Sequence, residues 1–294
     1  MTSTKPATTE PTIKLGLPKG HIKENVLELL RDANIEVEHR HRNYRPTFSM
    51  EGFEAKILKP QSVAKMVAAG SRDAGFTGAD WVAELDADLI EIMDTELDPV
   101  RLVAAAPEDQ VVDGKLPEGP LVVATEYERL TEVWLAEQGI EGTVIQSYGA
   151  TEVFPPEDAD CIVDVAQTGR TLEANDLEVV DTLLESSTRL YANPASLDDP
   201  EKSEAIERFK LLLRSVLDGR KRVMLEVNVV EDKLDAVVGA LPAMRKPTVA
   251  QLHNGDGYAV RAAVPKDRVT QIVPDIKEAG GTDIVVTDFS QIVS

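Results

Sequence analysis

The sequence predicts an α/β protein that carries a small separate domain at its carboxyl end. Before about residue 200, short apolar runs are followed by glycine-containing turns and amphipathic helices, a pattern typical of a parallel sheet with ligands at the carboxyl ends of its strands. After Arg220 the order becomes strand, helix, strand, strand, helix, strand. That order predicts a ferredoxin-like βαββαβ domain.

In the first part of the chain, strands and helices are expected in turn. The strands are short apolar runs bounded by turn residues, at 13–17, 54–58, 73–77, 100–106, 121–124, 143–146, 161–166, 179–184 and 188–192. Four helices follow from apolar residues at helical spacing: Ile22, Val26, Leu29, Leu30 and Ala33; Val63, Met66 and Val67; Tyr127, Leu130, Val133 and Trp134; Ile206, Phe209, Leu213 and Val216.

In the last part, we expect strands at 223–230, 248–252, 258–264 and 284–287, with helices at 233–240 and 269–279. A charged stretch with proline and glycine, Pro107 to Pro120, is suited to a crossover between subdomains. We therefore predict a disordered tail at 1–12, a subdomain at 13–106 completed by 189–218, a second subdomain at 107–188, and the small domain at 219–294.

Composition narrows the class of protein. The chain has 294 residues, 43% of them hydrophobic, and a net charge of -21. Its acids are dispersed rather than gathered in one tail, so we expect a solvated acidic surface and no nucleic-acid partner, with salt adaptation as the alternative explanation. An anionic ligand would need local cations and Mg²⁺ to overcome this charge.

Targeting signals are not apparent in the sequence. No segment reaches the roughly 18 apolar residues of a membrane span, and Met1 to Pro11 is polar. The single cysteine, Cys161, lies in an apolar run, which predicts a core residue in a reducing compartment. We expect a cytoplasmic protein with no membrane contact.

The most informative stretch is 159–172. An apolar strand, Cys161 to Ala166, is interrupted by Asp164 and followed by the turn Thr168-Gly169-Arg170-Thr171, whose glycine and hydroxyls suit a phosphate. Asp160 and Asp164, interpreted as lying at the carboxyl end of that strand, suit ribose hydroxyls or a divalent cation. The alternative is an ordinary strand-to-helix turn that Thr171 caps.

Basic residues near the amino terminus form a second candidate site. Lys19 lies in the turn between the first strand and the first helix, where an anion is favoured. Arg40, Arg42 and Arg45 stand out in so acidic a chain and suit a triphosphate. The alternative is a surface hairpin whose arginines balance nearby acids.

Three motifs carry a resemblance to a known family. The stretch from Asp160 to Leu172 resembles the phosphoribosyl-pyrophosphate (PRPP) loop of the ATP phosphoribosyltransferases, D-x-I-x-D-x-x-x-[ST]-G-x-T-L. Leu17 to His21 resembles the family's L-P-K-G-R, and Asp73 to Asp80 resembles D-x-G-I-T-G-x-D. Leu241-Pro242, Pro247-Thr248 and Ala279-Gly280-Gly281 resemble the regulatory domain of the long-form enzymes.

This resemblance implies a two-lobed catalytic region like that of periplasmic binding proteins, and the first reaction of histidine biosynthesis. PRPP would give its phosphoribosyl group to N1 of the adenine of ATP, with Mg²⁺ as cofactor. The catalytic residues implied are Asp160 and Asp164, the latter also as metal ligand. The residues implied to bind PRPP are Thr168, Gly169, Arg170, Thr171 and Leu172. Those implied to bind ATP are Lys19, Gly20, Arg42, Arg45, Thr77 and Gly78.

The long-form resemblance further implies inhibition by histidine and a homo-oligomer, a dimer or hexamer. The matching positions for histidine are Asn228, Met244, Lys246, Thr248 and Asp283, with oligomerisation alone as the alternative role of the domain. A different class also remains open, because two-lobed proteins include non-catalytic sensors that bind a phosphorylated metabolite.

Overall fold

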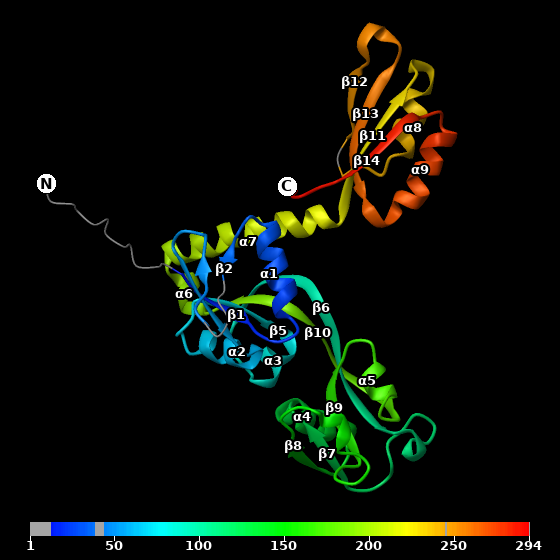
Figure 1. Ribbon diagram of the computed structural model, residues 1–294. Coiled ribbons are helices and arrows are strands. Elements are labelled where there is room, and N and C mark those ends of the chain that lie inside the picture. The colour runs from blue at the N-terminus through cyan, green and yellow to red at the C-terminus, as the bar shows by residue number, and fades with distance from the viewer. Residues whose placement is uncertain (1–12, 39–43, 245, 294) are drawn as a thin grey trace, which may run out of the picture. The chain divides into compact units, whose positions relative to one another are not determined.

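The computed structural model describes residues 13–38, 44–244 and 246–293 (Figure 1). Its contacts divide the chain into two compact units. The first runs to Glu28 and continues over Ile35–Glu207; the second joins Leu29–Asn34 to the chain from Arg208 onward. No helix in the described ranges is long and apolar enough to cross a membrane.

An eight-stranded sheet forms the first unit, in the order β4-β1-β5-β10-β6-β9-β7-β8. Its strands are β1 (Ile13–Pro18), β4 (Phe53–Leu58), β5 (Ala74–Gly78), β6 (Ile90–Pro107), β7 (Leu121–Thr125), β8 (Gly142–Gln146), β9 (Cys161–Ala166) and β10 (Leu177–Ala192). A separate two-stranded pair is made by β2 (Val37–Glu38) and β3 (Thr47–Phe48). The helices of this part of the chain are α1 (Lys23–Asp32), α2 (Pro60–Ala68), α3 (Ala79–Glu84), α4 (Glu128–Gln138), α5 (Arg170–Glu173), α6 (Pro194–Asp198) and α7 (Pro200–Arg220).

The sheet divides into two lobes that share β6 and β10. Lobe I holds β4, β1 and β5 with α2 and α3, and lobe II holds β9, β7 and β8 with α4 and α5. Figure 1 shows β6 and β10 running from the strands of one lobe to those of the other. The two-lobed α/β prediction is confirmed.

The strand directions differ in part from the prediction of a parallel sheet. β1 is parallel to β4 and β5, and β9 is parallel to β7. However, β10 is antiparallel to β5 and β6, and β6 is antiparallel to β9. The sheet is mixed because the two strands that join the lobes run against their neighbours.

Those two shared strands are also longer than predicted, 18 residues for β6 and 16 for β10. The β6–β10 pairing contains several register shifts, and Glu96 and Asp98 have φ angles of 58° and 50°. Such bulges break the alternation of apolar and polar residues while the strands stay paired. For this reason the apolar pattern indicated one short segment of β6 and two separate runs within β10.

Alternate residues of β6 pack on opposite faces of lobe II. Leu102 and Ala104 join a cluster with Trp134 of α4, whereas Val103 and Ala105 pack with Leu172 of α5. Strand periodicity thus gives lobe II a core on each side of its sheet. Two predicted core residues are instead exposed at the edges of their helices, Met66 at 39% and Val133 at 43%.

The carboxyl-terminal domain of the second unit is ferredoxin-like, as predicted. Its elements are β11 (Arg222–Val229), α8 (Leu234–Ala240), β12 (Thr248–Gln251), β13 (Tyr258–Pro265), α9 (Val269–Glu278) and β14 (Thr282–Asp288). The antiparallel sheet has the order β12-β13-β11-β14, and Val237, Ile272 and Ile276 of the helices pack against its buried face. The longer segment of this unit begins at Arg208, before the predicted domain start, and its Arg220 pairs with Asp32 of the shorter segment Leu29–Asn34 at 2.6 Å.

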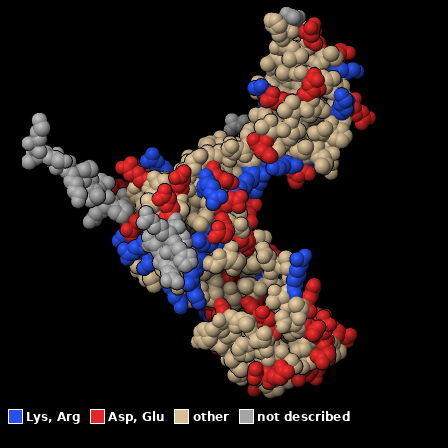
Figure 2. Space-filling view, viewed as in Figure 1, with Lys and Arg blue, Asp and Glu red and all other residues tan. Residues whose placement is uncertain are grey.

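Charge is distributed unevenly between the parts of the first unit. Residues 107–188, which include most of lobe II, contain 19 acidic and 3 basic side chains, a net charge of -16 out of -21 for the whole chain. Residues 13–106 contain 16 acidic and 12 basic side chains, a net charge of -4. Figure 2 shows the acidic side chains crowded over lobe II. An anion that binds to lobe II therefore meets an opposing field.

Candidate active site

A cavity of ≈ 380 Å³ surrounds the loop that follows β9. All five residues predicted for the PRPP loop line it, and so does Asp164. The full lining is His21, Val100, Glu152, Asp164, Val165, Ala166, Gln167, Thr168, Gly169, Arg170, Thr171 and Leu172. His21 and Glu152 were not among the predicted site residues, because they lie outside the loop motif, in the turn before α1 and in a short 3-10 helix before β9.

Gly169 gives the loop its shape. Its φ of 78° lies in the left-handed region that favours glycine, and it immediately precedes α5. A Cβ built at this position meets no atom within 4 Å. A side chain there would therefore cost backbone strain and would project into open space beside the loop.

The remaining loop residues divide into binding groups and an anchor. Thr168, Arg170 and Thr171 are exposed, so their hydroxyls and guanidinium face solvent in and around the cavity. Leu172 is only 6% exposed and packs with Ala159 and other core residues on the α5 side of the sheet. The polar side chains can meet a ligand because Leu172 fixes the loop from beneath.

Asp164 is the half-buried acid of β9 that faces this cavity. Its Oδ1 accepts a hydrogen bond from the N–H of Val165 at 2.7 Å. Burial, together with the negative charges of Glu126 and Glu152, raises the pKa of Asp164 to about 6, although the Val165 N–H and the Thr151 hydroxyl partly oppose the shift. The carboxylate is ionised at neutral pH and repels its acidic neighbours, so a cation or hydroxyl donor would be favoured there.

Asp160 lies at the other end of the same strand. It precedes the first residue of β9, and its Oδ2 accepts a hydrogen bond from the N–H of Val122 at 2.7 Å. Four residues of strand separate it from Asp164 by about 13 Å. The expectation that both acids lie at the carboxyl end is wrong, because the strand begins after Asp160 rather than before it.

Mg²⁺ fits the donor set of the loop cavity in a limited way. In the described ranges, no group of three His, Cys, Asp or Glu side chains is arranged to hold a metal ion. Mg²⁺ usually keeps several waters and binds through one or two carboxylates together with substrate phosphates. A single ionised carboxylate at Asp164, beside an anion loop, meets that requirement.

The amino-terminal turn of lobe I faces the same cavity through His21. Gly20 has a φ of 89°, and the Nζ of Lys19 lies 6.0 Å from the centre of the Tyr44 ring. Arg45 is exposed at the start of the next described segment. Arg40 and Arg42, the other members of the predicted basic cluster, lie outside the described residues.

The second turn predicted for ATP in lobe I is occupied by internal contacts. Thr77 is fully buried, and its hydroxyl donates to the carbonyl of Pro60 at 2.9 Å. A Cβ on Gly78 would collide with the carboxylate of Asp80. The structure therefore places the Thr77 hydroxyl in the fold of lobe I and not at a binding surface.

A buried hydrogen-bond network joins α3 of lobe I to α4 of lobe II. The Tyr127 hydroxyl donates to Oδ2 of Asp80 at 2.6 Å, and the Ser186 hydroxyl donates to its Oδ1 at 2.6 Å. Burial and the negative charge of Asp80 raise the pKa of Tyr127 above its usual range, so the phenol stays protonated as the donor. This network has no signature in the sequence because its three residues come from distant segments.

Beside that network, α3 and α4 cap each other. The carboxylate of Glu84 accepts from the N–H groups of Arg129 and Leu130, both at 3.0 Å, in the first turn of α4. The Arg129 guanidinium donates to the carbonyls of Ala83 and Glu84 at the end of α3. The Glu84 carboxylate thus satisfies N–H groups that α4 leaves unpaired, and the Arg129 guanidinium adds donors to carbonyls at the end of α3. We refer to residues Asp80, Glu84, Tyr127, Arg129 and Ser186 as the lobe latch.

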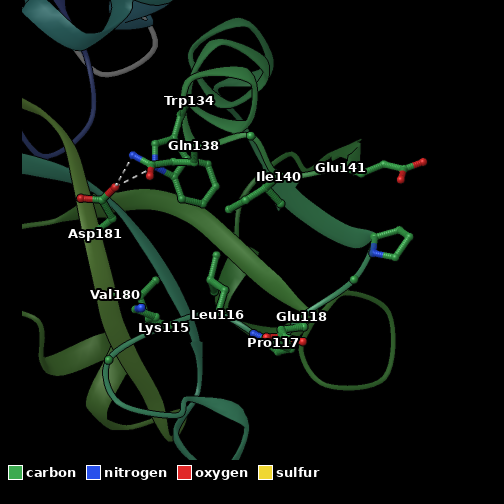
Figure 3. Close-up of a pocket in the computed structure, with 14 residues that line it drawn as sticks. Lys115, Leu116, Pro117, Glu118, Trp134, Gln138, Ile140, Glu141, Val180 and Asp181 are labelled. Carbon is green, nitrogen blue, oxygen red and sulfur yellow. Dashed lines mark hydrogen bonds between the residues drawn. The ribbon is translucent and has the colours of Figure 1, made fainter.

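A larger cavity, ≈ 570 Å³, lies elsewhere in lobe II between segment 114–120, the end of α4 and β10 (Figure 3). Its walls include Leu116, Ile140 and Trp134, and the Trp134 indole N–H donates to the carboxylate of Asp181 at 2.8 Å. No predicted site residue lines it. The loop cavity is the better candidate because it combines an anion loop with an ionised acid.

Cys161 is confirmed as a core residue. It is completely buried in β9, and burial raises the pKa of its thiol to about 12. A thiol that remains protonated is a poor nucleophile.

The residues predicted for histidine lie on the carboxyl-terminal domain. Asn228 Nδ2 donates to Oδ2 of Asp283 at 3.2 Å across β11 and β14. Thr248 is exposed on β12, which β13 separates from β11. Lys246 is exposed just before β12, and the N–H of Met244 donates to the carbonyl of Ala263 at 3.0 Å. Asn228 and Asp283 are in contact, and the other three approach the opposite edge of the sheet.

Comparison with known proteins gave matches over both parts of the chain. Residues 59–215 match the family model described as ATP phosphoribosyltransferase, and residues 219–291 match the model described as HisG, C-terminal domain. The ATP phosphoribosyltransferase of Pelotomaculum thermopropionicum is 37% identical over 286 residues, 96% of this chain and 99% of the relative. That of Chlorobaculum parvum is also 37% identical, over 96% of this chain and 97% of the relative.

Among solved structures, the ATP phosphoribosyl transferase (HisG:HisZ) complex from Thermotoga maritima contains a similar chain. The two are 28% identical in sequence with a TM-score of 0.61, and the match covers 69% of this chain and 96% of that one. The similarity extends from the motifs to the arrangement of most of the chain.

Proposed function

The chain belongs to the ATP phosphoribosyltransferase family in its long form, an enzyme family of histidine biosynthesis, and from this premise we propose the reaction and the role of each site residue. The phosphoribosyl group of PRPP is transferred to N1 of the adenine of ATP, which gives phosphoribosyl-ATP and pyrophosphate. The observation that carries this proposal is the loop cavity, in which a glycine-shaped phosphate loop and an ionised acid lie together.

The loop holds the 5'-phosphate of PRPP. Thr168 and Thr171 donate from their hydroxyls, and the Arg170 guanidinium supplies charge that the acidic lobe II otherwise lacks. Gly169 lets the backbone approach the phosphate closely. Leu172 keeps the loop in place through its buried side chain.

Asp164 orients the ribose. Its carboxylate accepts hydrogen bonds from the ribose hydroxyls or would coordinate a Mg²⁺ ion that binds them, and the ionised form serves either role. Mg²⁺, when bound, neutralises charge on the departing pyrophosphate. Asp160 contributes to catalysis only indirectly, because it fastens the start of β9 to β7.

The adenine ring needs no general base, since N1 already carries a lone pair. Catalysis therefore rests on holding N1 in line with the anomeric carbon and on stabilising the leaving group. The ATP side of the site is formed by Lys19, Gly20 and Arg45, together with Arg42 outside the described residues. Thr77 and Gly78 support it through the packing of lobe I.

An assay of the purified full chain with ATP, PRPP and Mg²⁺ tests this proposal. We expect phosphoribosyl-ATP and pyrophosphate in equal amounts, identified by mass spectrometry, and no product when either substrate is omitted. Binding of PRPP without product would favour a sensor instead. Absence of both binding and product would remove the proposed function.

We further propose that histidine inhibits the enzyme from the carboxyl-terminal domain. An amino acid needs an acceptor for its ammonium and donors for its carboxylate. Asn228 and Asp283 offer acceptors, and Lys246 and Thr248 offer donors toward the opposite edge of the sheet, on the same side as Met244. Removal of the domain is a poor test, because Ile292 donates to the carbonyl of Ser215 in α7. Instead, Asn228→Ala and Thr248→Val in the full chain should raise the half-inhibitory histidine concentration about tenfold.

Arg268→Gln is the control in the same assay, because Arg268 is exposed near the start of α9 and is not among the residues proposed to bind histidine. Unchanged inhibition in both site variants would reject these histidine contacts.

The family resemblance also supports a cytoplasmic homo-oligomer, a dimer or hexamer, in which the effector lies between neighbouring subunits. Sedimentation of the full chain with and without histidine tests the assembly, and a monomer under both conditions would contradict it.

A further inference from the structure

A second cavity adjoins the loop cavity at the strands that connect the lobes. It has a volume of ≈ 480 Å³ and shares Val100, Ala166 and Gln167 with the loop cavity. Its other lining residues are Asp94, Glu96, Pro99, Arg101, Glu185, Ser186, Ser187 and Arg189. A ligand in the loop cavity can extend into this hinge cavity past the end of β9.

Two arginines line the hinge cavity and differ in how they are engaged. Arg189 pairs with Glu91 at 2.7 Å and with Asp94 at 3.4 Å, and also donates to the Ser187 hydroxyl. Arg101 is exposed, and no described residue forms an ion pair or a side-chain hydrogen bond with its guanidinium. Arg101 is therefore the cation of this cavity that is free to bind a ligand.

The strand register places Arg101 beside the catalytic loop. It lies directly opposite Ala166, the last residue of β9, and on its other side opposite Glu185 of β10. Asp164 is two residues before Ala166 and therefore points to the same face of the sheet. Diagonal neighbours of this kind have Cα atoms about 7–8 Å apart. Arg101 and Asp164 thus flank the passage between the two cavities.

The shortage of basic residues in the acidic stretch 107–188 makes Arg101 important for binding an anionic substrate. The acidic stretch 107–188 contains three basic residues, Lys115, Arg129 and Arg170. Lys115 lines the larger cavity, and the Arg129 guanidinium is held by the carbonyls of α3. Arg170 is then the cation that this stretch brings to the loop. A substrate with several phosphates needs more positive charge than one arginine supplies.

We propose that Arg101 is a further substrate-binding residue, whose guanidinium binds a diphosphate or triphosphate chain that extends from the loop cavity into the hinge cavity. The inference rests on the proposed function and deepens it. The shared chemistry is a phosphate chain, supplied by the pyrophosphate group of PRPP or by the triphosphate of ATP. The fork of a guanidinium can bind two oxygens of such a chain at once.

The acids of the hinge cavity sharpen the proposal. Asp94 is neutralised by Arg189 and accepts from the Ser187 hydroxyl. Glu185 faces Arg101 across the strand pair but forms no ion pair with it in the described structure. A phosphate chain that binds Arg101 would therefore be repelled by Glu185, so the two residues should affect binding in opposite directions.

The test is calorimetric titration of the full chain with Mg²⁺ present, using pyrophosphate, PRPP and ATP as separate probes. Arg101→Gln should weaken binding of pyrophosphate and of one or both substrates about 10- to 100-fold, as expected for a charge-assisted hydrogen-bonded contact. Arg101→Lys should lose less, because charge is kept and only the fork is lost. Glu185→Gln should tighten binding a few-fold.

Lys115→Gln supplies the matched control, because it removes one positive charge from lobe II at the other cavity. It should leave all three affinities within about twofold. Weakened PRPP with unchanged ATP assigns the chain to PRPP, and the reverse assigns it to ATP. Unchanged affinities in Arg101→Gln, or equal losses in Lys115→Gln, would overturn the inference. A wild-type chain that binds no PRPP would instead reject the proposed function.

Discussion

Lobes I and II differ in how they assemble their candidate residues. In lobe II, one continuous stretch supplies the whole loop proposed to bind phosphate, and all five of its predicted residues line one cavity with Asp164. In lobe I, the predicted residues come from separate turns, and one of them, Thr77, is buried with its hydroxyl engaged. A local motif fixes its own geometry, whereas a dispersed site depends on how distant segments pack.

Charge extends this contrast. The lobe that holds the proposed phosphate loop is the acidic one, so a phosphate bound there would rely on a few arginines and on backbone donors. Lobe I is nearly balanced and keeps lysine and arginine near its turns. If this account is correct, PRPP binding should respond sharply to single changes in the loop, and ATP binding should respond weakly to changes in the buried turn.

The largest effect is expected from Asp164→Asn. Loss of the carboxylate charge should lower kcat/KM for PRPP about 100- to 1,000-fold, because a positioning and electrostatic contact is removed at unchanged volume. Asp160→Asn, at the other end of β9, should lower it only a few-fold. Equal losses in both variants would show that the two aspartates act together after all.

The pH dependence of the Asp164 variant sharpens the same point. Since the folded pKa of Asp164 is about 6, the wild-type rate should fall below pH 6 as the carboxylate protonates. The ratio of wild-type to Asp164→Asn rates cancels the titration of substrate phosphates, which also occurs near pH 6. Because the folded pKa is raised, ionisation of Asp164 destabilises the folded state, and this cost builds up as pH rises from about 4 to about 6. The free energy of unfolding of Asp164→Asn should therefore exceed that of the wild type by about 1–2 kcal/mol at pH 8 and nearly equal it at pH 4.

The next largest effect is expected at Gly169. Gly169→Val should weaken PRPP binding about 100-fold, because a β-branched residue resists the positive φ and projects into the cavity. Gly169→Ala adds only a methyl group into open space. Its loss of PRPP binding free energy should therefore stay near the roughly 1–2 kcal/mol of backbone strain. Equilibrium titration with PRPP compares them. Similar affinity in the valine variant and wild type would place the phosphate elsewhere.

The lobe latch should affect stability more than catalysis. Arg129→Met keeps the apolar stem but removes the guanidinium that donates to the carbonyls of Ala83 and Glu84, and should lower the free energy of unfolding by about 2 kcal/mol. Glu132→Gln, at an exposed position of the same helix, should change it by less than about 0.5 kcal/mol. Denaturant unfolding measures both. Two separate transitions in Arg129→Met would indicate that the latch couples the lobes.

The smallest effect on binding is expected at Thr77. Thr77→Val keeps the shape and removes the bond to Pro60, so stability should fall by about 1 kcal/mol while KM for ATP changes less than about threefold. Lys19→Met, in the partly exposed turn of the same lobe, should raise KM for ATP about tenfold. A large ATP effect from Thr77→Val would restore that residue to the binding site.

The sequence predicted elements and local motifs better than long-range contacts. The turn and helix start that follow Ala166 and the ferredoxin-like order are confirmed, because turn chemistry and periodicity are local properties. The full lengths of β6 and β10 were missed, because bulges interrupt their alternation. The prediction that Asp160 lies at the carboxyl end of the strand is wrong, because β9 begins at Cys161, directly after Asp160.

The lobe latch and the position of Arg101 lie beyond what the sequence alone could give. Each acquires its role from segments far apart in the chain: Tyr127 meets Asp80 across 47 positions, and Arg101 meets the end of β9 only through strand pairing. The residue type at these positions is compatible with an ordinary surface or core residue. Only the sheet order brings them to the site.

Hydrogen exchange measured by mass spectrometry, with and without PRPP and Mg²⁺, tests most directly the central claim that the loop of lobe II is the PRPP site. Binding should slow exchange in peptides that cover 164–173, because the ligand orders the loop and its N–H groups donate to phosphate. Peptides that cover 114–120 and 138–141, at the larger cavity, should exchange at unchanged rates. Protection at the larger cavity with none at 164–173 would contradict the account.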